Sequence, residues 1–551
     1  MKRSLLVMTA VIVFSLLLVT GAFATTTRCV NVTGSGGCFS TIQSAVNASA
    51  EGDIVSVYPG VYFERVYIAT AGLTLMGTAS AHGGTGTVID AFDYLKGVAL
   101  PNPPVGNSGI YVDNVDRVTI KNLAVRNAPH TSAPNGYNIE IYGNYATINN
   151  VQSLLSYYAG IYIDGDHATV MNCFSAGHDD EGVYIDGDYA TVKYNTISGN
   201  ESDGIYVDGG YPTVINNVIT LADGECIDLE NANYAVVTGN KVSDCESTGI
   251  YVADGSNVTV SNNVIRNAES ECLEFSDVGD STISSNDIAF CDEYGIYNCD
   301  TGYNNNKYLN NTVNYIFDGY ESYYICDDNP TITGNKGSYN DDESIFFVEC
   351  NSTCTGGTFS NNYASHANDG YYGFYLESDR LMISGNIAEY NSYSGFYIYY
   401  YSDGLNTVTK NISRYNGYGD NAYGGFEIYS ADTTVSYNQA LNNNGFGFYI
   451  EEDNVIVNNN IANNNIGTGI ELYDGGSNYT MTLSNNTVKN NVAEGIATDN
   501  TGASSVISVT NNLSQGNRLD VCKVAGSLDA TTFTGNIFTT GGKDVSCDVT
   551  D

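Results

Sequence analysis

Glycine, apolar residues, tyrosine and an acid recur along the chain in one fixed order. The unit reads Gly160-Ile161-Tyr162-Ile163-Asp164, and it returns at residues 182–186 and 204–208, each time after 22 residues. A fixed period of 20–50 residues is typical of a solenoid, in which every repeat forms one coil that stacks on the previous coil. The pattern therefore indicates one long repetitive body, although a chain of 551 residues would otherwise suggest several domains.

The repeat continues in both directions with small changes in spacing and sequence. Related units begin at Asn138, Cys226, Gly249, Cys272, Gly295, Gly373, Gly395, Gly425, Gly447 and Gly469. A second column of one residue type follows the same period, at Asn195, Asn217, Asn240, Asn263 and Asn286. The final acid changes to Ala253 and Ser276 in the next units, so the run of terminal acids in successive units lies in the first third of the solenoid.

Within each unit apolar residues alternate with tyrosine or an acid, which is the period of a β-strand and not of a helix. Valine, isoleucine, tyrosine and phenylalanine favour strands, whereas glycine, asparagine and aspartate favour turns. We therefore predict an all-β fold, a single-stranded right-handed parallel β-helix with coils about 4.8 Å apart. The inward apolar residues should form its core, the asparagine column a hydrogen-bonded ladder, and the tyrosine column a stack.

The N-terminus has the features of a secretory signal peptide. Lys2 and Arg3 precede an apolar stretch at 5–19, and a small-residue cleavage motif follows at 22–24. The alternative is an uncleaved membrane anchor. We expect a signal peptide over 1–24, an N-terminal cap and first coils over 25–78, β-helix repeats over 79–520 and a C-terminal coil and cap over 521–551. No later segment is apolar enough to span a membrane, so the expected location is secreted or at the cell surface.

The charge balance limits the partners of this protein. The chain has 62 acidic residues against 20 Lys and Arg, for a net charge of −42. Nucleic acid is excluded as a partner, because almost no positive charge is available to neutralise phosphates. Anionic polymers would be repelled unless a cation bridges them. The expected partners are polysaccharide or envelope components, together with further copies of the chain.

The 13 cysteines are too few for a disulfide scaffold of this length and odd in number. We expect disulfides that close loops at the two ends and one that joins neighbouring coils: Cys29–Cys38, Cys522–Cys547 and Cys299–Cys326. Cys226 and Cys272 are two coils apart, which is too far for them to pair with each other. The odd count leaves at least one free thiol or an intermolecular bridge, and Cys350 and Cys354 form either a local disulfide or free thiols.

Asn-x-Ser/Thr sequons are also present and are compatible with a glycosylated surface protein. The ten sequons begin at Asn31, Asn47, Asn200, Asn257, Asn310, Asn351, Asn411, Asn478, Asn485 and Asn512.

The N-terminal region resembles a known superfamily. A short amphipathic helix is expected over 40–50, and Gly52–Glu64 reads as strand, turn and strand. This arrangement resembles the opening of the pectin lyase-like superfamily, and the repeats look like its right-handed β-helix, NosD-like and surface-protein branch. The resemblance implies the fold but no activity. The motifs of pectin methylesterases are absent, and residues 177–180 contain parts of two polygalacturonase motifs in the wrong arrangement.

One column of acids is the strongest hint of chemistry in the sequence. Asp164, Asp186, Asp208 and Glu230 end successive units and should lie one above the next. Two like charges about 5 Å apart repel by about 1 kcal/mol in water and about 3 kcal/mol at an effective dielectric of 20. Hard divalent cations relieve such repulsion, so we expect this column to bind Ca²⁺. The alternative is a solvated acidic face screened by salt.

Catalysis by paired carboxylates is a further alternative in the same region. Its candidate residues are Asp179, Asp180, Asp186, Asp208, His178 and Lys193. Lys193 is the only Lys or Arg between 160 and 230, so a base for polysaccharide β-elimination is scarce. The tyrosine column either stacks on sugars, packs against another subunit or is structural.

We expect a secreted or cell-surface β-helix protein that binds or packs in an envelope, sheath or adhesive role and is associated with Ca²⁺. The sequence leaves enzymatic activity open and favours a binding role; the alternative is a polysaccharide lyase or glycoside hydrolase with its site in residues 160–230.

Overall fold

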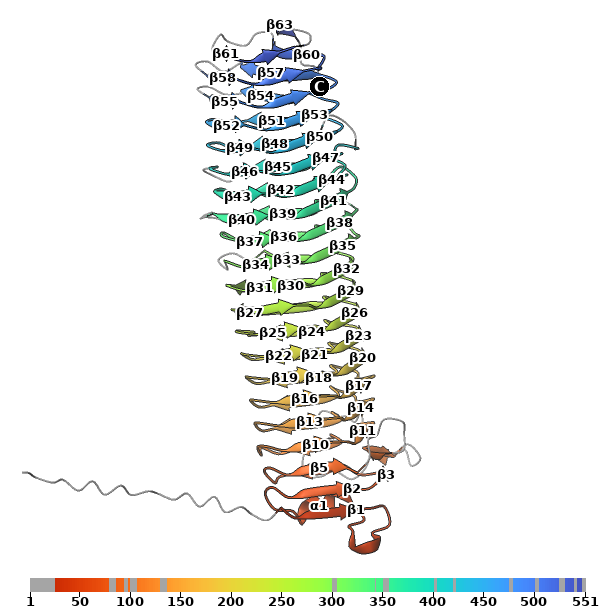
Figure 1. Ribbon diagram of the computed structural model, residues 1–551. Helices are drawn as coiled ribbons and strands as arrows, with labels where there is room; N and C mark the ends of the chain where they lie inside the picture. The colour runs from red at the N-terminus through yellow and green to blue at the C-terminus, as the bar shows by residue number, and fades with distance from the viewer. Residues whose placement is uncertain are drawn as a thin grey trace, which may run out of the picture.

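The computed structural model describes most of the chain as one column of stacked coils (Figure 1). The described residues are 25–78, 86–93, 98–99, 107–128, 136–299, 305–341, 343–349, 356–400, 404–419, 423–474, 479–500, 505–524, 531–539 and 543–547. The predicted signal peptide at 1–24 lies outside them. No helix among the described residues has the length and apolar character needed to cross a membrane.

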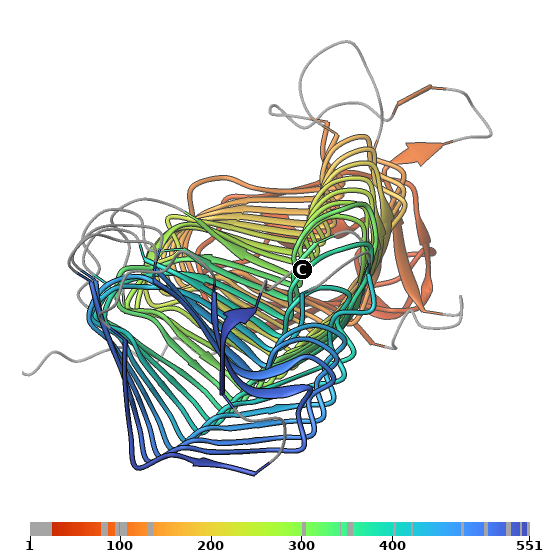
Figure 2. The same ribbon diagram turned by 90° about the horizontal axis from the view of Figure 1, so that it is seen from above.

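Each coil contributes one strand to each of three parallel sheets. In one coil these are β18 (Val183–Asp186) in sheet C, β19 (Thr191–Lys193) in sheet A and β20 (Thr196–Asn200) in sheet B. Seen along the axis, the coils superimpose as a three-sided tube that twists gradually from end to end (Figure 2). The all-β, right-handed parallel β-helix predicted from the sequence is confirmed.

The strands of sheet C carry the repeated unit. They include β4 (Val66–Ile68), β9 (Ile110–Val112), β12 (Ile139–Tyr142), β15 (Ile161–Asp164), β18, β21 (Ile205–Asp208), β24 (Ile227–Glu230), β27 (Ile250–Ser256), β30 (Leu273–Gly279), β33 (Ile296–Asn298), β36 (Tyr323–Cys326), β39 (Phe346–Glu349), β42 (Phe374–Glu377), β45 (Phe396–Tyr399), β48 (Phe426–Tyr429), β51 (Phe448–Glu451), β54 (Ile470–Asp474) and β57 (Glu494–Asn500).

Sheets A and B are built in the same way. Sheet A runs from β1 (Thr27–Val30) and β2 (Ile54–Val57) to β61 (Thr531–Thr534). In its central part sheet B contains β23 (Val218–Ala222), β26 (Lys241–Cys245), β29 (Val264–Ala268), β32 (Asp287–Cys291), β35 (Thr312–Ile316), β38 (Lys336–Asn340), β41 (Tyr363–Ala367), β44 (Ile387–Glu389), β47 (Ile412–Arg414) and β50 (Gln439–Leu441).

The core is a set of identical side chains stacked coil on coil. Phe374, Phe396, Phe426 and Phe448 are fully buried in register, with ring centroids 4.6–4.8 Å apart. The glycine of the repeated unit is a steric requirement, since a Cβ atom on Gly204 would lie 2.5 Å from the carbonyl oxygen of the next coil. Apolar and glycine positions therefore specify the fold, as each fully buried apolar side chain contributes about 1.5–3 kcal/mol.

The predicted asparagine ladder is confirmed. The amide of Asn195 donates to Oδ1 of Asn217 at 3.0 Å, and Asn217 donates to Asn240 in the same way. The ladder continues to Asn536 and its members from Asn195 to Asn512 are buried. A second ladder, which the sequence did not reveal, runs from Asn391 to Asn517.

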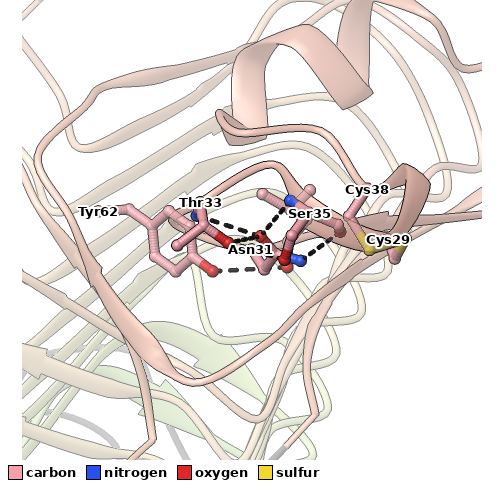
Figure 3. The surroundings of a disulfide bond; sticks show 7 residues. Cys29, Asn31, Thr33, Ser35, Cys38 and Tyr62 are labelled. Carbon is pink, nitrogen blue, oxygen red and sulfur yellow. Dashed lines mark hydrogen bonds between the residues drawn. A yellow bond between two sulfur atoms is a disulfide. The ribbon is translucent and has the colours of Figure 1, made fainter.

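The N-terminal end is covered by α1 (Ile42–Asn47), within the helix expected over 40–50, and α1 lies beside β1 and β2 (Figure 1). Thr41 caps its N-terminus through a bond from the backbone N–H of Ser44 at 3.2 Å. The Cys29–Cys38 disulfide closes the loop after β1, and Oδ1 of Asn31 accepts the N–H of Thr33 at 3.1 Å inside that loop (Figure 3). The open first coil is thus shielded from water.

Four disulfides are present among the described residues: Cys29–Cys38, Cys226–Cys245, Cys272–Cys291 and Cys299–Cys326. The first and last are predicted pairs, whereas the other two join residues of one coil and were not expected. Cys522 is disulfide-bonded. The Cys547 side chain, Cys350 and Cys354 lie outside the described part. Cys173 is a free, buried thiol whose pKa burial raises to about 12.

A buried carboxylate cluster on sheet C as the candidate functional site

The outer face of sheet C is acidic along most of the column. Its described strands from β4 to β57 contain no Lys or Arg. Two columns of outward side chains run along this face, one led by tyrosines and one by acids. Because no positive charge balances these acids, the face favours cations over anions.

The predicted acid column exists but does not converge on one point. The strand register places Asp164, Asp186, Asp208 and Glu230 one above the next, one per coil. Burial and then the charges of Asp164 and Asp208 raise the pKa of Asp186. Asp164 and Asp186 are exposed, and Asp208 accepts a hydrogen bond from the Asn231 amide at 2.7 Å. A role of this column in binding Ca²⁺ stays a prediction.

The neighbouring pair Asp166 and Asp188 joins adjacent coils. Oδ1 of Asp166 accepts the backbone N–H of Asp188 at 3.0 Å, and Oδ1 of Asp188 accepts that of Gly210 at 2.8 Å. These carboxylates therefore hold turns together, and part of their hydrogen-bonding capacity is already used.

Three other carboxylates do converge. Asp203, Glu225 and Asp228 each offer an oxygen atom, and these atoms lie within 4.8 Å of one another. Asp203 and Glu225 are the last residues of the turns from sheet B to sheet C in two successive coils. The backbone carbonyl of Asp203 accepts the N–H of Gly182 in the coil before it, and that of Glu225 accepts the N–H of Gly204 in the same way. Asp228 lies in β24, where it takes the place of a tyrosine and pairs in register with Tyr206. We call these three residues the carboxylate cluster.

The carboxylate cluster is largely shielded from water. Asp203 is 7% exposed and Asp228 is 9% exposed, while Glu225 is half-buried. Oδ1 of Asp203 accepts the backbone N–H of Glu225 at 2.9 Å, and Glu225 accepts the Ser247 hydroxyl at 3.0 Å. Oδ1 of Asp228 is buried and has no hydrogen-bond partner in the described structure. An unpartnered buried carboxylate oxygen is costly, so this atom is available for a ligand.

The pKa values of Asp203 and Asp228 are raised. Burial first, and then the hydrogen bond and charge of Glu225, raise the pKa of Asp203. Burial, followed by the charges of Glu225 and Glu230, raises the pKa of Asp228 to about 7. At neutral pH the cluster therefore retains protons when no cation is bound. A divalent cation would replace those protons and relieve the repulsion.

A disulfide holds two members of the cluster in place. Cys226 lies between Glu225 and Asp228 and is bonded to Cys245 in β26, with a Cα–Cα distance of 5.6 Å. Both cysteines are buried. The strand and the turn that carry these carboxylates are thus tied to the end of β26, which stacks on the end of β23 just before that turn.

The structure corrects the list of catalytic candidates. His178 is buried; its Nδ1 accepts the backbone N–H of Ser156 at 3.1 Å, its Nε2 lies 3.0 Å from the Ser175 hydroxyl, and burial lowers its pKa to about 3. Lys193 is the last residue of β19 in sheet A, not in sheet C. These two residues therefore do not meet the acids of sheet C.

The remaining candidates lie close to the sheet C face. Asp180 and Glu181 end the turn one coil before Asp203, and burial raises the pKa of both. Asp179 is exposed in the same turn. Asp186 and Asp208 belong to the acid column described above, separate from the cluster.

The tyrosine column stacks as predicted, with Tyr162–Tyr184 and Tyr184–Tyr206 centroids 5.0 and 4.7 Å apart. Sequence reasoning missed the carboxylate cluster because the residues it singled out, the terminal acids and the catalytic candidates, include none of its three members. The signal was present at the residue before the first position of each unit, where Glu181, Asp203 and Glu225 recur with the same period.

Comparisons with known proteins agree with this architecture. A family model described as "Right handed beta helix region" matches residues 181–336 and 344–514, together more than half of the chain. A second model, "Periplasmic copper-binding protein (NosD)", matches residues 91–257. No curated protein sequence matches the chain.

Solved structures with a similar fold have low sequence identity. The mannuronan C-5 epimerase A-module of Azotobacter vinelandii is 14% identical, with 63% of this chain and 89% of that chain covered and a TM-score of 0.39. DFA-IIIase from Arthrobacter chlorophenolicus is 14% identical, with 65% and 93% covered and a TM-score of 0.35. Pectate lyase Pel9A is 16% identical, with 53% and 76% covered and a TM-score of 0.36. Values this low carry no functional argument.

Proposed function

We propose that the chain, which belongs to the right handed beta helix family, is an exported binding protein that holds Ca²⁺ in the carboxylate cluster. The bound ion would let the acidic face of sheet C bind anionic polysaccharide or envelope components. The observation that carries this proposal is the buried, unpartnered Oδ1 of Asp228 beside two further carboxylates.

The donor set favours a hard cation. Ca²⁺ is bound by carboxylate, carbonyl and water oxygens, and three carboxylates supply several of these ligands. Copper prefers imidazole and sulfur ligands. Within the described residues, the two histidines of the region matched by the copper-binding family model are engaged elsewhere: His178 is buried, and His167 stacks between Tyr145 and Tyr189. The described histidines of this region therefore do not form a copper site.

Export is supported by the disulfides, because such bonds persist in oxidising compartments such as the periplasm and the cell exterior. The predicted signal peptide and the match to a periplasmic family model point the same way.

A bound cation also explains how so acidic a face could hold an anionic partner. The described strands of sheet C between β4 and β57 offer no basic side chain to such a polymer. Glu225 is half-buried, so an ion held there would keep one side open to water or to a ligand oxygen. The expected Kd for Ca²⁺ is about 0.1–1 mM, as in extracellular calcium-binding modules.

Terbium luminescence tests the ion site directly. Tb³⁺ replaces Ca²⁺ and emits when a nearby tyrosine is excited, and the strand register places Tyr206 and Tyr251 on either side of Asp228. We expect saturable emission that Ca²⁺ displaces. Asp228→Asn should weaken binding at least tenfold, whereas Asp186→Asn, in the acid column, should leave it unchanged. Equal binding by Asp228→Asn and the wild type would refute this site.

Hydrolysis or elimination of a polysaccharide remains the second candidate, because the raised pKa of Asp203 would keep a protonated carboxyl beside other carboxylates at neutral pH. Turnover of pectin, alginate or a related glycan that Asp203→Asn abolishes would establish it. Glycan binding without turnover would support the binding function instead.

A further inference from the structure

Six aromatic rings form an uninterrupted stack along the outer edge of sheet B, beginning three coils after Leu221 in the same column. Their centroids are 4.6–5.5 Å apart, and no interplanar angle exceeds 25°. They occupy equivalent positions in six successive coils: Phe290, Tyr315, Tyr339, His366, Tyr390 and Tyr415. We call this stack the aromatic ladder.

These rings are kept at a cost in backbone energy. All six residues have φ between 57° and 65°, in the left-handed region that bulky residues rarely adopt. That conformation is strained for residues other than glycine, asparagine and aspartate. The equivalent residues of adjoining coils are Asp244, Asn267 and Asn442, which tolerate it. At these six positions the sequence has aromatic residues in place of the asparagine or aspartate that the backbone conformation favours.

The aromatic ladder presents edges, not faces. Phe290, Tyr315, Tyr339 and Tyr390 are each 40–43% exposed. Because each inner ring is covered on both faces by its neighbours, only ring edges and hydroxyls reach solvent. Sugars stack on exposed aromatic faces, so the interior of the ladder does not suit a glycan. A continuous strip of edges suits contact with another protein surface, where tyrosine is enriched.

The charges at the two ends of the aromatic ladder indicate what kind of protein surface could pack against it. The rings form a strip without carboxylates or ammonium groups on a chain of net charge −42. Asp292 and Asp318 lie beside the Phe290 end, and Arg414 lies beside Tyr415 at the other end. Arg414 pairs with Glu389 yet remains 41% exposed. Two such strips placed antiparallel bring the acidic end of each to the basic end of the other.

We propose that the aromatic ladder is a contact surface for a second copy of this chain, packed antiparallel about a two-fold axis. Tyr339 then lies opposite His366 of the partner subunit. Six coils at about 4.8 Å span about 29 Å, and the five-residue strands of sheet B are about 17 Å long, so each copy contributes about 500 Å². That is at the lower end for specific interfaces, so the contact is weak and matters where copies are crowded on a surface.

Replacing ladder tyrosines with asparagine should weaken association of two copies without destabilising the fold, so the two effects can be measured separately. Tyr339→Asn with Tyr390→Asn removes two rings and inserts the residue that the Asn267 and Asn442 coils already carry, so the melting temperature should be unchanged or higher. The matched control is Tyr189→Asn with Tyr211→Asn. Those tyrosines are also exposed, left-handed and stacked at 4.6 Å, but at the junction of sheets C and A.

Sedimentation velocity in EDTA over about 10 μM to 1 mM measures the association without metal bridging. The wild type should show a concentration-dependent dimer, the aromatic-ladder variant at least tenfold weaker association, and the control variant the wild-type value. A monomeric wild type at 1 mM, equal weakening by both variants, or a ladder variant that associates like the wild type would each overturn the proposal. Because no metal is present, these outcomes do not depend on the calcium site.

Charge exchange tests the antiparallel orientation. Asp292→Arg should weaken the dimer, because with Tyr339 opposite His366 the Phe290 coil, which carries Asp292, faces Arg414 of the partner subunit. Adding Arg414→Glu to the same chain should restore it at least tenfold. Association that stays weak in the double variant would reject this orientation.

Discussion

The backbone N–H of Glu225 donates a hydrogen bond to Oδ1 of Asp203 at 2.9 Å, so the main chain of one coil binds the side chain of the coil before it. This bond holds two carboxylates together that repulsion would otherwise separate. Asp228, whose Oδ1 has no partner within the described structure, completes the arrangement. The predictions below follow from this cluster and from the stacking that positions it.

Cation affinity should rise with pH. The pKa of Asp203 is raised and that of Asp228 is about 7, so protons compete with the metal at neutral pH and below. We expect the apparent Kd for Ca²⁺ to fall about tenfold or more between pH 6 and pH 8, measured by calorimetry. Calorimetry in buffers of different ionisation enthalpy should also detect proton release. A Kd that is independent of pH would contradict the assignment of the site.

Removing the disulfide beside the cluster should weaken ion binding. Cys226→Gly with Cys245→Ala introduces the residues found at the same positions of the adjoining coils, Gly204 and Ala222. A disulfide that closes a loop of this length stabilises by about 3 kcal/mol, so the melting temperature should fall. We expect Ca²⁺ affinity to fall as well.

The matched control for that variant is Cys272→Gly with Cys291→Ala. It removes an equivalent disulfide two coils away, also with a separation of 19 residues. It should lower stability to a similar extent but leave the Kd for Ca²⁺ at its original value. Equal loss of affinity in both variants would show that the disulfide acts only through overall stability.

Stability without metal should be greatest in mildly acid solution, between about pH 4 and pH 6. Burial raises the folded-state pKa values of Asp228, Glu321 and Glu427 to about 7, 8 and 7, above their ordinary values near 4. Between pH 4 and pH 8 the unfolded chain binds fewer protons than the folded chain, so the free energy of unfolding falls as pH rises. His178 acts oppositely below pH 6.5, because its folded-state pKa is about 3.

Thermal melts in EDTA from pH 3 to pH 9 would measure this dependence. The melting temperature should decline by several degrees from pH 5 to pH 8, and millimolar Ca²⁺ should recover part of that loss in the wild type but not in Asp228→Asn. A melting temperature that rises steadily to pH 8 without Ca²⁺ would be incompatible with these pKa shifts.

We expect exposed sequons to carry glycans and buried sequons to carry none. Asn200, Asn411 and Asn512 are buried, and Asn411 and Asn512 donate to the asparagine ladder. Asn257 and Asn485 are exposed in turns. If the chain meets a glycosylating pathway, mass spectrometry of its peptides should find glycans only at exposed sequons. A glycan on Asn411 would mean that modification precedes folding of that coil.

The sequence predicted the features that repeat with the period of the coils. It did not predict contacts between residues at different positions of a coil, because these depend on how the coil bends at its turns. Alternation and spacing were enough for the strands, the Asn195–Asn217 ladder and the tyrosine stack, because these repeat along one column. The cluster combines Asp203 and Glu225 from one column with Asp228 from another, and the distance between columns depends on turn conformations. The same reason hid the Cys226–Cys245 bond, which joins the residue before β24 to the last residue of β26.

His178 illustrates a second limit. Its position among Asp179, Asp180 and Glu181 suggested a catalytic group, yet its backbone N–H bonds to Oδ1 of Asn200 at 3.5 Å and its ring points into the coil. The side chain of a polar residue at a turn can point into the coil or out to solvent, and its contacts with the neighbouring coil determine which orientation it takes. Identity and spacing alone therefore did not distinguish a structural histidine from a functional one.

The regular coil spacing relates the length of this protein directly to its number of coils. Sheet A has 21 strands, and at about 4.8 Å each the column is about 100 Å long. Each duplicated coil of 22 residues would extend it by one step without altering the cross-section or any existing contact inside it. Whichever end is fixed to a surface, the reach of the carboxylate cluster and of the aromatic ladder into the medium is set by how many coils lie beneath them.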